Sequence, residues 1–289
     1  MSSIQLVWLI TGTSSGIGRE LALAALKRGD KVIATARGRS VSKLGDLEGR
    51  GASVLELDVT APLEDLQQIA EAASKIYNRI DVLVNNAGYI HVGAVEESTP
   101  QESLDQFNTN VFGALNVSRA FLPAMRLQKS GTIVFIGSIG GWRAVPNAGL
   151  YAATKYAIRG ISETLHEEIS PLGLRSICFD FGYFRTNFLT DGNRAPYNSR
   201  ISDYEPMSKK SNAALVAYNG KQPGDPNKGV EIMIDVVKGE GEEKGKAFPT
   251  VLALGSDCYN GVKEASEKTL SRLEEWKDLT ISTDFPKGT

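Results

Sequence analysis

Short apolar, β-branched runs alternate with longer segments of helical periodicity along most of the chain. The strand-like runs are residues 5–11, 31–36, 53–59, 81–86, 132–138, 175–181 and 248–254. The helical segments are residues 16–29, 62–77, 103–125, 151–169, 229–237 and 265–276. Strands separated by helices of this length form βαβ units and therefore a parallel sheet covered on both faces. The pattern predicts an α/β fold with a doubly wound parallel sheet.

The pattern also predicts how the chain is organised. No repeat or low-complexity linker divides it, so we expect one domain over residues 1–289. Its cofactor half would span about residues 1–130, and its catalytic and substrate half about residues 131–289. The alternation stops over residues 183–224, which are too aromatic for a solvated linker. A long insertion of this kind is typical of an extended substrate loop or lid, and the alternative is a structural excursion packed on the body.

Composition narrows the class of partner. Hydrophobic residues make up 42% of the 289 residues and charged residues 23%, which is typical of a globular protein. Lysine and arginine number 32 and aspartate and glutamate 34, so the chain lacks the positive field that nucleic-acid binding uses. We therefore expect a small neutral or weakly charged partner and no nucleic acid.

Cysteine, histidine and hydropathy patterns predict the compartment. Cys178 lies in an apolar run far from Cys258, which favours a reduced thiol over a disulfide. The first residues lack the features of a secretory leader, and no apolar run reaches about 18 residues, so we expect no membrane span and a cytoplasmic protein. With only His91 and His166 available, we expect no zinc centre.

A glycine-rich turn follows the first predicted strand and leads directly into a helix. Residues 11–18 read TGTSSGIG, and Gly12, Gly16 and Gly18 allow a tight turn and close approach of the backbone to a ligand. The unpaired N–H groups at the helix start suit a pyrophosphate. The spacing differs from the commoner G-x-G-x-x-G, but its placement predicts a dinucleotide site. The alternative is a structural turn without a ligand.

The end of the second strand predicts which dinucleotide binds. A free ribose 2′-hydroxyl is bound by an acid at this point, about 20 residues beyond the glycine turn. Here Ala36 occupies that position and Arg37 follows it. A guanidinium can pair with a 2′-phosphate, so NADP(H) is favoured over NAD(H), and Arg39 could share the task. Alternatively, Arg37 is an ordinary surface arginine.

Five motifs in order resemble the short-chain dehydrogenase/reductase family. They are TGTSSGIG at 11–18, NNAG at 85–88, Asn110, Ser138 at the end of a strand, and YAATK at 151–155. The resemblance covers about the first 190 residues. The longer C-terminal part is similar to the branch of the family that handles steroids, retinoids and other apolar carbonyls.

Tyr151 and Lys155 lie four residues apart and therefore on one face of a helix. An ammonium near a phenol favours the phenolate, so Lys155 is expected to lower the tyrosine pKa from its ordinary value near ~10. The resemblance implies that Tyr151 is the general acid and base and that Ser138 binds the substrate oxygen. It further implies that Lys155 holds the nicotinamide ribose and that Asn110 anchors a water in a proton relay. The alternative for Asn110 is a hydrogen bond inside its helix.

The resemblance implies further contacts. Phe181 stands where the family has a proline, but Gly182 and Thr186 keep the usual spacing. The implied cofactor residues, besides the three glycines, Arg37, Tyr151 and Lys155, are Ser14, Ser15, Ile17, Asp58, Val59, Asn86, Ala87, Gly88, Gly182, Phe184 and Thr186. The substrate-lining candidates are Ser138, Tyr151, Trp142, Tyr89 and Phe188. Of the aromatic residues, Trp142, Tyr89, Phe184 and Phe188 could equally pack in the core.

The leading hypothesis is an NADP(H)-dependent oxidoreductase that interconverts a ketone or aldehyde and an alcohol on a fairly apolar small molecule. Tyr151 would act as general acid and base during hydride transfer. The alternatives are a β-ketoacyl-thioester reductase and a catalytically silent NADP(H)-binding sensor or scaffold. The resemblance also suggests a homodimer formed through the predicted helices at 101–126 and 150–170.

Overall fold

A computed structural model describes residues 4–190 and 199–285 of the chain. Its strands form one parallel sheet in the order β3-β2-β1-β4-β5-β6-β7. The strands are β1 Val7–Ile10, β2 Lys31–Ala36, β3 Ser53–Glu56, β4 Val82–Asn85, β5 Gly131–Ser138, β6 Leu174–Phe181 and β7 Val251–Leu254. β1 pairs with β2 on one side and β4 on the other, so the strand order reverses there. The predicted doubly wound α/β fold is confirmed.

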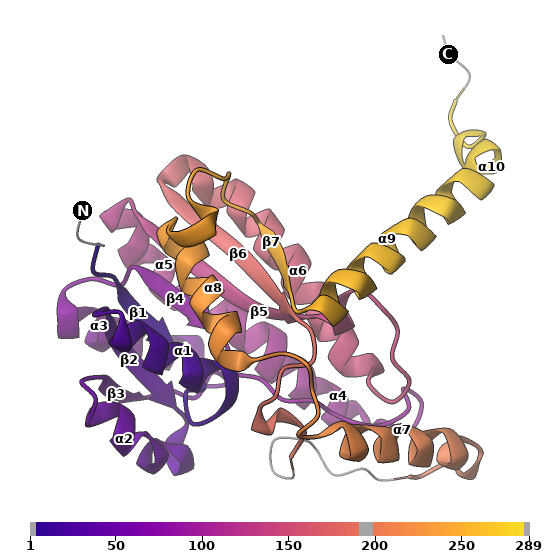
Figure 1. Cartoon of the computed structure of the whole chain (residues 1–289), viewed down its shortest axis with the longest axis horizontal. Helices are drawn as coiled ribbons and strands as arrows, with labels where there is room; N and C mark the ends of the chain where they lie inside the picture. Colours follow the sequence, from indigo (N-terminus) through magenta and orange to yellow (C-terminus); the bar gives the residue numbers. More distant parts are fainter. Residues whose placement is uncertain (1–3, 191–198, 286–289) are drawn as a thin grey trace.

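Helices cover both faces of this sheet (Figure 1). They are α1 Gly16–Lys27, α2 Gly45–Glu48, α3 Leu63–Tyr77, α4 Pro100–Phe107, α5 Ala114–Gln128, α6 Gly149–Ile169, α7 Glu205–Tyr218, α8 Pro226–Lys238, α9 Ser256–Glu275 and α10 Lys277–Ile281. The chain also forms a π-helical turn, η2 Asn108–Gly113, and short 3₁₀ turns. The 3₁₀ turns are η1 Gly38–Leu44, η3 Ile139–Gly141, η4 Ser170–Leu172, η5 Asn187–Leu189, η6 Ser202–Tyr204 and η7 Gly241–Glu243.

The alternation of side chains along β1 shows why both faces are apolar. Trp8 and Ile10 pack with the buried faces of α1 and α8, whereas Val7 and Leu9 pack with α3 and α5 on the opposite face. Successive side chains of a strand point to opposite faces, so a strand covered on both sides must be apolar at every position. The short run VWLI meets this requirement.

The helical segment predicted at 103–125 is present but is built from three parts. α4 begins with a capping box, in which Glu102 N donates to Thr99 Oγ1 and Thr99 N donates to the Glu102 carboxylate. The π-helical turn η2 then joins α4 to α5 and contains Asn110. A π-type turn widens the helix locally and is frequent at functional sites.

The insertion at 183–224 is more ordered than a loop, because α7 forms within it. The sequence reading missed this helix, since its apolar residues do not form a pronounced stripe. Ser208 on α7 is buried and donates to Asn147 Oδ1 at 2.9 Å. Part of the predicted substrate loop, residues 191–198, lies outside the described residues.

A charged cluster ties the start of this helical segment to the body. Arg200 donates to both carboxylate oxygens of Glu102, at 2.7 and 2.9 Å, and its backbone N donates to Glu97. Hydrogen bonding with Arg200 lowers the pKa of Glu102 to about 2. Tyr204 adds a hydrogen bond to Glu96 at 2.6 Å. These contacts hold α7 over the carboxyl ends of the strands.

The C-terminal helices α9 and α10 extend away from the body in Figure 1. Cys258 and Gly261 pack the first turns of α9 on the body, and residues 266–285 are exposed. Among residues 4–190 and 199–285, no helix has both the length and the apolar composition that crossing a membrane requires.

Candidate active site

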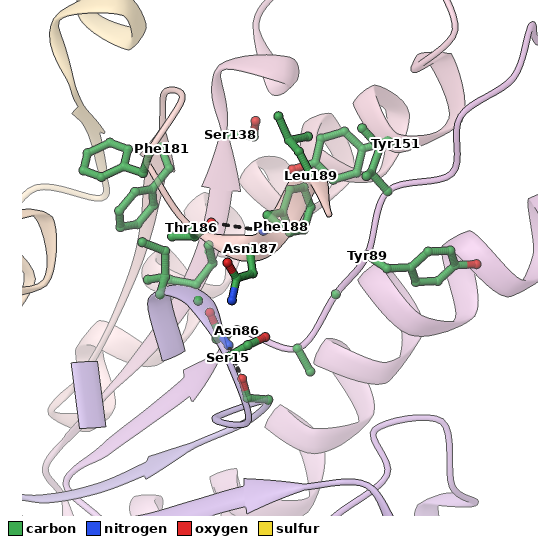
Figure 2. A pocket seen from close by; sticks show the side chains of 18 of the residues that line it. Ser15, Asn86, Tyr89, Ser138, Tyr151, Phe181, Thr186, Asn187, Phe188 and Leu189 are labelled. Atoms are coloured by element: carbon green, nitrogen blue, oxygen red, sulfur yellow. Dashed lines mark hydrogen bonds between the residues drawn. The ribbon is translucent and has the colours of Figure 1, made fainter. Parts of the chain in front are cut away.

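A cavity of about 1100 Å³ lies at the carboxyl ends of the strands. It runs from the turn after β1 to the end of β5 and the first turns of α6, and η5 and α7 contribute to its wall. Open parallel sheets bind ligands at this edge, where the strand order reverses. Figure 2 shows Ser15 and Asn86 at one end and Ser138 with Tyr151 at the other.

The glycine turn has the backbone that its sequence predicts. Gly12 and Gly16 have φ angles of +70° and +64°, which favour glycine. A Cβ at Gly12 would come within 3.0 Å of the Ala87 backbone, and one at Gly18 would collide with the Asn86 side chain. Asn86 Nδ2 in turn donates to the carbonyls of Thr11 and Gly12, at 2.8 and 3.1 Å. The turn is therefore packed closely against the end of β4 and leaves the start of α1 facing the cavity.

Basic residues line the part of the cavity beside the end of β2. Arg37 begins this stretch, and η1 follows it at once. The basic and hydroxyl side chains on this wall are Arg37, Arg39, Ser40 and Lys43. Asp58 also lines the cavity, and it accepts hydrogen bonds from the backbone and hydroxyl of Thr60, at 2.9 and 2.7 Å. Ser40 and Lys43 were not identified from the sequence, which singled out Arg37 and Arg39 on this wall.

At the opposite end, the structure brings together the three predicted chemical residues. Ser138 ends β5, and Tyr151 and Lys155 lie one turn apart on α6. All three line the cavity. Lys155 Nζ donates to the Ile136 carbonyl at 2.6 Å and lies 5.5 Å from the centre of the Tyr151 ring. The site thus contains two hydroxyls and an ammonium at the end of one strand.

Burial dominates the protonation of this pair. Burial raises the pKa of Tyr151 to about 12, although the hydrogen bond with Ser138 acts to lower that pKa. Burial also lowers the pKa of Lys155 to about 8, while nearby Cys178 and Asp180 work in the opposite direction. The expectation that Lys155 lowers the tyrosine pKa below its ordinary value is wrong for these residues by themselves. Desolvation is the largest cause of both shifts, because burial disfavours the phenolate and the ammonium alike.

Replacing Lys155 with methionine is expected to stabilise the fold at neutral pH. The pKa of Lys155 falls from 10.5 to about 8 on folding, so its buried charge destabilises the folded state below pH 8. That shift corresponds to a cost on the order of 3 kcal/mol, or a rise in Tm of about 5 °C when the charge is removed. The difference in Tm between Lys155→Met and the native chain should shrink as pH rises from 8 to 10.5, because the native lysine is then neutral in the folded protein.

Thermal unfolding of both proteins across this pH range measures the effect. Lys268→Met on the exposed part of α9 is the control, and its Tm should not depart from that of the native chain. A Lys155→Met variant that unfolds at a lower temperature at neutral pH would contradict the assignment of a buried charge.

Asn110 lies behind the cavity wall and not in it. Its Nδ2 donates to the Tyr89 carbonyl at 3.0 Å and to Thr154 Oγ1 at 3.3 Å, and its Oδ1 accepts from the Tyr89 backbone at 3.1 Å. Thr154 Oγ1 donates to the Tyr151 carbonyl at 2.7 Å. Asn110 therefore joins the strand-end loop to the helix that carries Tyr151. Its part in a proton relay stays a prediction.

The segment after β6 reaches the cavity despite the missing proline. Gly182 N donates to the Leu254 carbonyl at 2.9 Å, and Tyr183 N donates to the Asp257 carboxylate at 2.7 Å. Phe181 is buried and meets Phe184 edge to face, with ring centres 4.8 Å apart. An aromatic pair thus replaces the proline here. Of the predicted cofactor residues, all except Gly18 line the cavity.

The predicted substrate residues separate into two groups. Phe188 lies beside Tyr151, with ring centres 6.0 Å apart, and lines the cavity. Tyr89 also lines it, but its ring is directed away from Ser138 and Tyr151 in Figure 2. Trp142 does not line the cavity; its indole N–H donates to Asp180 at 2.6 Å.

An apolar cluster next to Tyr151 contains the predicted Phe188 together with lining residues that the sequence reading missed. Ile90 and Ala148 are buried there, and Val145, Phe188 and Leu215 pack against them. Leu215 comes from α7, whose Ser211, Ala214 and Tyr218 also line the cavity. Only recognition of a helix within the insertion could have identified the residues on α7, and the nearest sequence signal is Pro206 in its first turn.

Comparisons with known proteins agree with this fold. A family model for short chain dehydrogenases matches residues 6–196. The chain is similar to "Oxidoreductase BOA17" of Botryotinia fuckeliana, with 32% identity over 284 residues that cover 96% of this chain and 98% of that protein. It is 37% identical over 196 residues to a 3-ketodihydrosphingosine reductase of Bacteroides thetaiotaomicron, which covers 68% of this chain and 70% of that protein.

Solved structures give the same result. A short-chain dehydrogenase from Streptomyces avermitilis superimposes with a TM-score of 0.85 at 35% identity, covering 98% of this chain and all of that one. An actinorhodin polyketide ketoreductase variant with NADPH has a TM-score of 0.73 at 26% identity, covering 89% and 98%. The parallel sheet is that of an oxidoreductase fold. The chain belongs to the short-chain dehydrogenase/reductase family.

Proposed function

We propose that this protein is an NADP(H)-dependent oxidoreductase that interconverts a carbonyl group and an alcohol on a fairly apolar small molecule. The observation that carries the proposal is the meeting of Ser138, Tyr151 and Lys155 at one end of a cavity whose other end is the glycine turn. A hydroxyl pair beside an ammonium can polarise and protonate a carbonyl oxygen, and the turn suits a dinucleotide.

The chain's own residues account for the proton and for orientation. When bound, NADP(H) supplies or accepts the hydride at its nicotinamide ring. In the direction of reduction, Ser138 Oγ hydrogen-bonds the substrate oxygen and Tyr151 gives its phenol proton to that oxygen as the carbon receives hydride. The phenolate that remains is stabilised by the charge of Lys155 and regains a proton from solvent. In oxidation, each step runs in reverse.

The basic wall supports NADP(H) as the cofactor. Arg37, Arg39 and Lys43 are exposed side chains around one end of the cavity, where a ribose 2′-phosphate would carry its charge. The glycine turn fits the same molecule, because side chains at Gly12 and Gly18 would crowd Ala87 and Asn86. The NADPH-bound polyketide ketoreductase shows that a related structure accepts this cofactor.

The lining beside Tyr151 supports an apolar substrate. Ile90, Val145, Phe188 and Leu215 form its surface, and none of them can pair with a charged group. Burial of apolar substrate area against them contributes about 25 cal/mol per Å². A small, hydrated ketone gains little from such a surface, whereas a longer chain or a ring system gains more.

Reduction of ketones of different size tests this function. We expect NADPH consumption with methyl octyl ketone to show a kcat/KM at least about 100-fold above that with acetone, because each buried methylene contributes about 0.8 kcal/mol. Equal values for the two ketones would contradict the apolar lining as the source of selectivity. No consumption with any ketone or aldehyde, by a protein that binds NADPH, would favour a silent cofactor-binding protein instead.

A further inference from the structure

Asp180 is a buried carboxylate directly behind the proposed catalytic residues. It lies on β6, beside Gly137 of β5, and is 1% exposed. Its Oδ1 accepts from the Ser138 backbone N–H at 3.1 Å and lies 3.5 Å from the donor Cys178 Sγ. Its Oδ2 accepts from the Trp142 indole N–H at 2.6 Å. All three donors are neutral groups, so these contacts are hydrogen bonds and not ion pairs.

The two strongest of these bonds hold the two ends of one short turn. Ser138 ends β5, η3 follows, and Trp142 comes directly after it. Within the turn, Gly140 N donates to Ser138 Oγ at 3.0 Å, and Trp142 N donates to the Ile139 carbonyl at 3.1 Å. The orientation of the Ser138 hydroxyl therefore depends on the shape of this turn.

Arg159 connects the same turn to the helix that carries Tyr151 and Lys155. Its guanidinium lies over the Trp142 ring, 3.8 Å from the ring centre, and donates to the Gly141 carbonyl at 2.8 Å. The turn is thus fixed to β6 through Asp180 and to α6 through Arg159. This double attachment sets the position of Ser138 relative to Tyr151.

The surroundings are shaped for a carboxylate. A Cβ at Gly137 would collide with Asp180 Oδ1 and would lie 2.6 Å from Cys178 Sγ, so only glycine leaves room for the acid on the neighbouring strand. An amide cannot replace the carboxylate without loss. Asparagine has one acceptor oxygen, and its NH₂ group would face one of the two N–H donors. A buried donor left without an acceptor destabilises the folded state.

We propose that Asp180 is a positioning residue: its two carboxylate oxygens hold both ends of the turn from Ser138 to Trp142 and thereby fix the Ser138 hydroxyl against Tyr151. The kinetic part of this inference rests on the function proposed above. Neither Asp180 nor Trp142 lines the cavity, so their effect on the substrate is indirect.

The charge of Asp180 gives the proposal a second, electrostatic readout. Burial raises the pKa of Tyr151 and Asp180 adds to that rise, whereas burial lowers the pKa of Lys155 and Asp180 opposes it. Removing the charge should therefore lower both pKa values. The titratable and charged groups that face this region are Cys178 on β6, Tyr151, Lys155 and Arg159 on α6, Tyr183 after β6, Arg143 after η3, and Cys258 and Asp257 on α9.

The kinetic test compares Asp180→Asn with Trp142→Phe and with their combination. We expect each single change to lower kcat for methyl octyl ketone by about 10-fold or more, with the NADPH Kd within about twofold of the native value. The double variant should lose little beyond the larger single effect, because both changes break one connection. Of the two single variants, only Asp180→Asn should move the alkaline limb of the rate profile to lower pH. Asp278→Asn, on exposed α10, is the matched control and should change none of these quantities.

Several outcomes would overturn the proposal. They are an unchanged kcat in a folded Asp180→Asn, additive losses in the double variant, or a parallel loss of NADPH binding. If Asp180→Asn does not fold, Trp142→Phe alone decides through its kcat and NADPH Kd. If the native chain reduces no ketone, the proposed function is wrong, and the position of the turn in the variants then tests the role of Asp180. A crystal structure of either variant with a displaced turn from Ser138 to Trp142 supports it, and a superimposable turn overturns it.

Discussion

The Tyr151→Phe variant is expected to bind NADPH as the native protein does and to reduce methyl octyl ketone about 1000-fold more slowly. Proton transfer by a positioned side chain contributes about 10²–10⁴-fold to a rate, and phenylalanine removes only the proton donor. The ring keeps its place beside Phe188, 6.0 Å away between centres. Single-turnover rates and the NADPH Kd, measured on the same preparation, check both parts.

Tyr156→Phe is the matched control for this change. Tyr156 lies on the same helix but is 43% exposed and does not line the cavity, so its loss of a hydroxyl should leave the rate unchanged. Unaltered turnover in Tyr151→Phe would show that the phenol is not the acid. Loss of NADPH binding in the same variant would instead mean that the residue acts through the shape of the site.

The second large effect concerns the choice of cofactor. Arg37→Ala is expected to raise the NADPH Kd by about 10–100-fold, because hydrogen bonds to a charged group contribute about 1.5–3 kcal/mol. The NADH Kd should change by less than about twofold, since that molecule has no 2′-phosphate. A fluorescence titration of native and variant protein with both nucleotides measures the two values.

Two further variants make this test specific. Arg39→Ala removes a neighbouring guanidinium on the same wall and should have a smaller effect if Arg37 is the principal contact. Arg50→Ala, at an exposed position outside the cavity, should have none. A native protein that prefers NADH, or equal losses for NADH and NADPH in Arg37→Ala, would show that Arg37 does not read the phosphate.

Much of the fold could be predicted because its signals are local. Each buried strand is a short β-branched run, and the helices that pack on the sheet, such as α3 and α8, have an apolar stripe. The glycine turn is equally local: Gly12 and Gly16 adopt positive φ angles that few other residues tolerate. Tyr151 and Lys155 lie four residues apart on a helix, and this spacing alone predicts that both side chains line the same cavity.

Other parts of the site depend on contacts between distant segments. Leu215 reaches the cavity only because Arg200 and Ser208 attach the α7 segment to residues about 100 and 60 positions earlier. The pKa of Tyr151 was misjudged for a related reason. Spacing predicts the nearby ammonium, but the desolvation that raises the phenol pKa comes from the whole surrounding fold.

The packing of α8 against α1 affects how this protein can be synthesised. Val230, Met233 and Ile234 of α8 cover the face of β1 and α1, and Lys238 forms a buried ion pair with Asp30 at 2.9 Å. A nascent chain therefore carries an uncovered apolar face from its first βα unit until about 200 residues later. At ribosomal rates that interval lasts roughly 10 to 40 s. During this time Asp30 lacks its lysine and the β1 face is open to chaperones and to other unfinished chains.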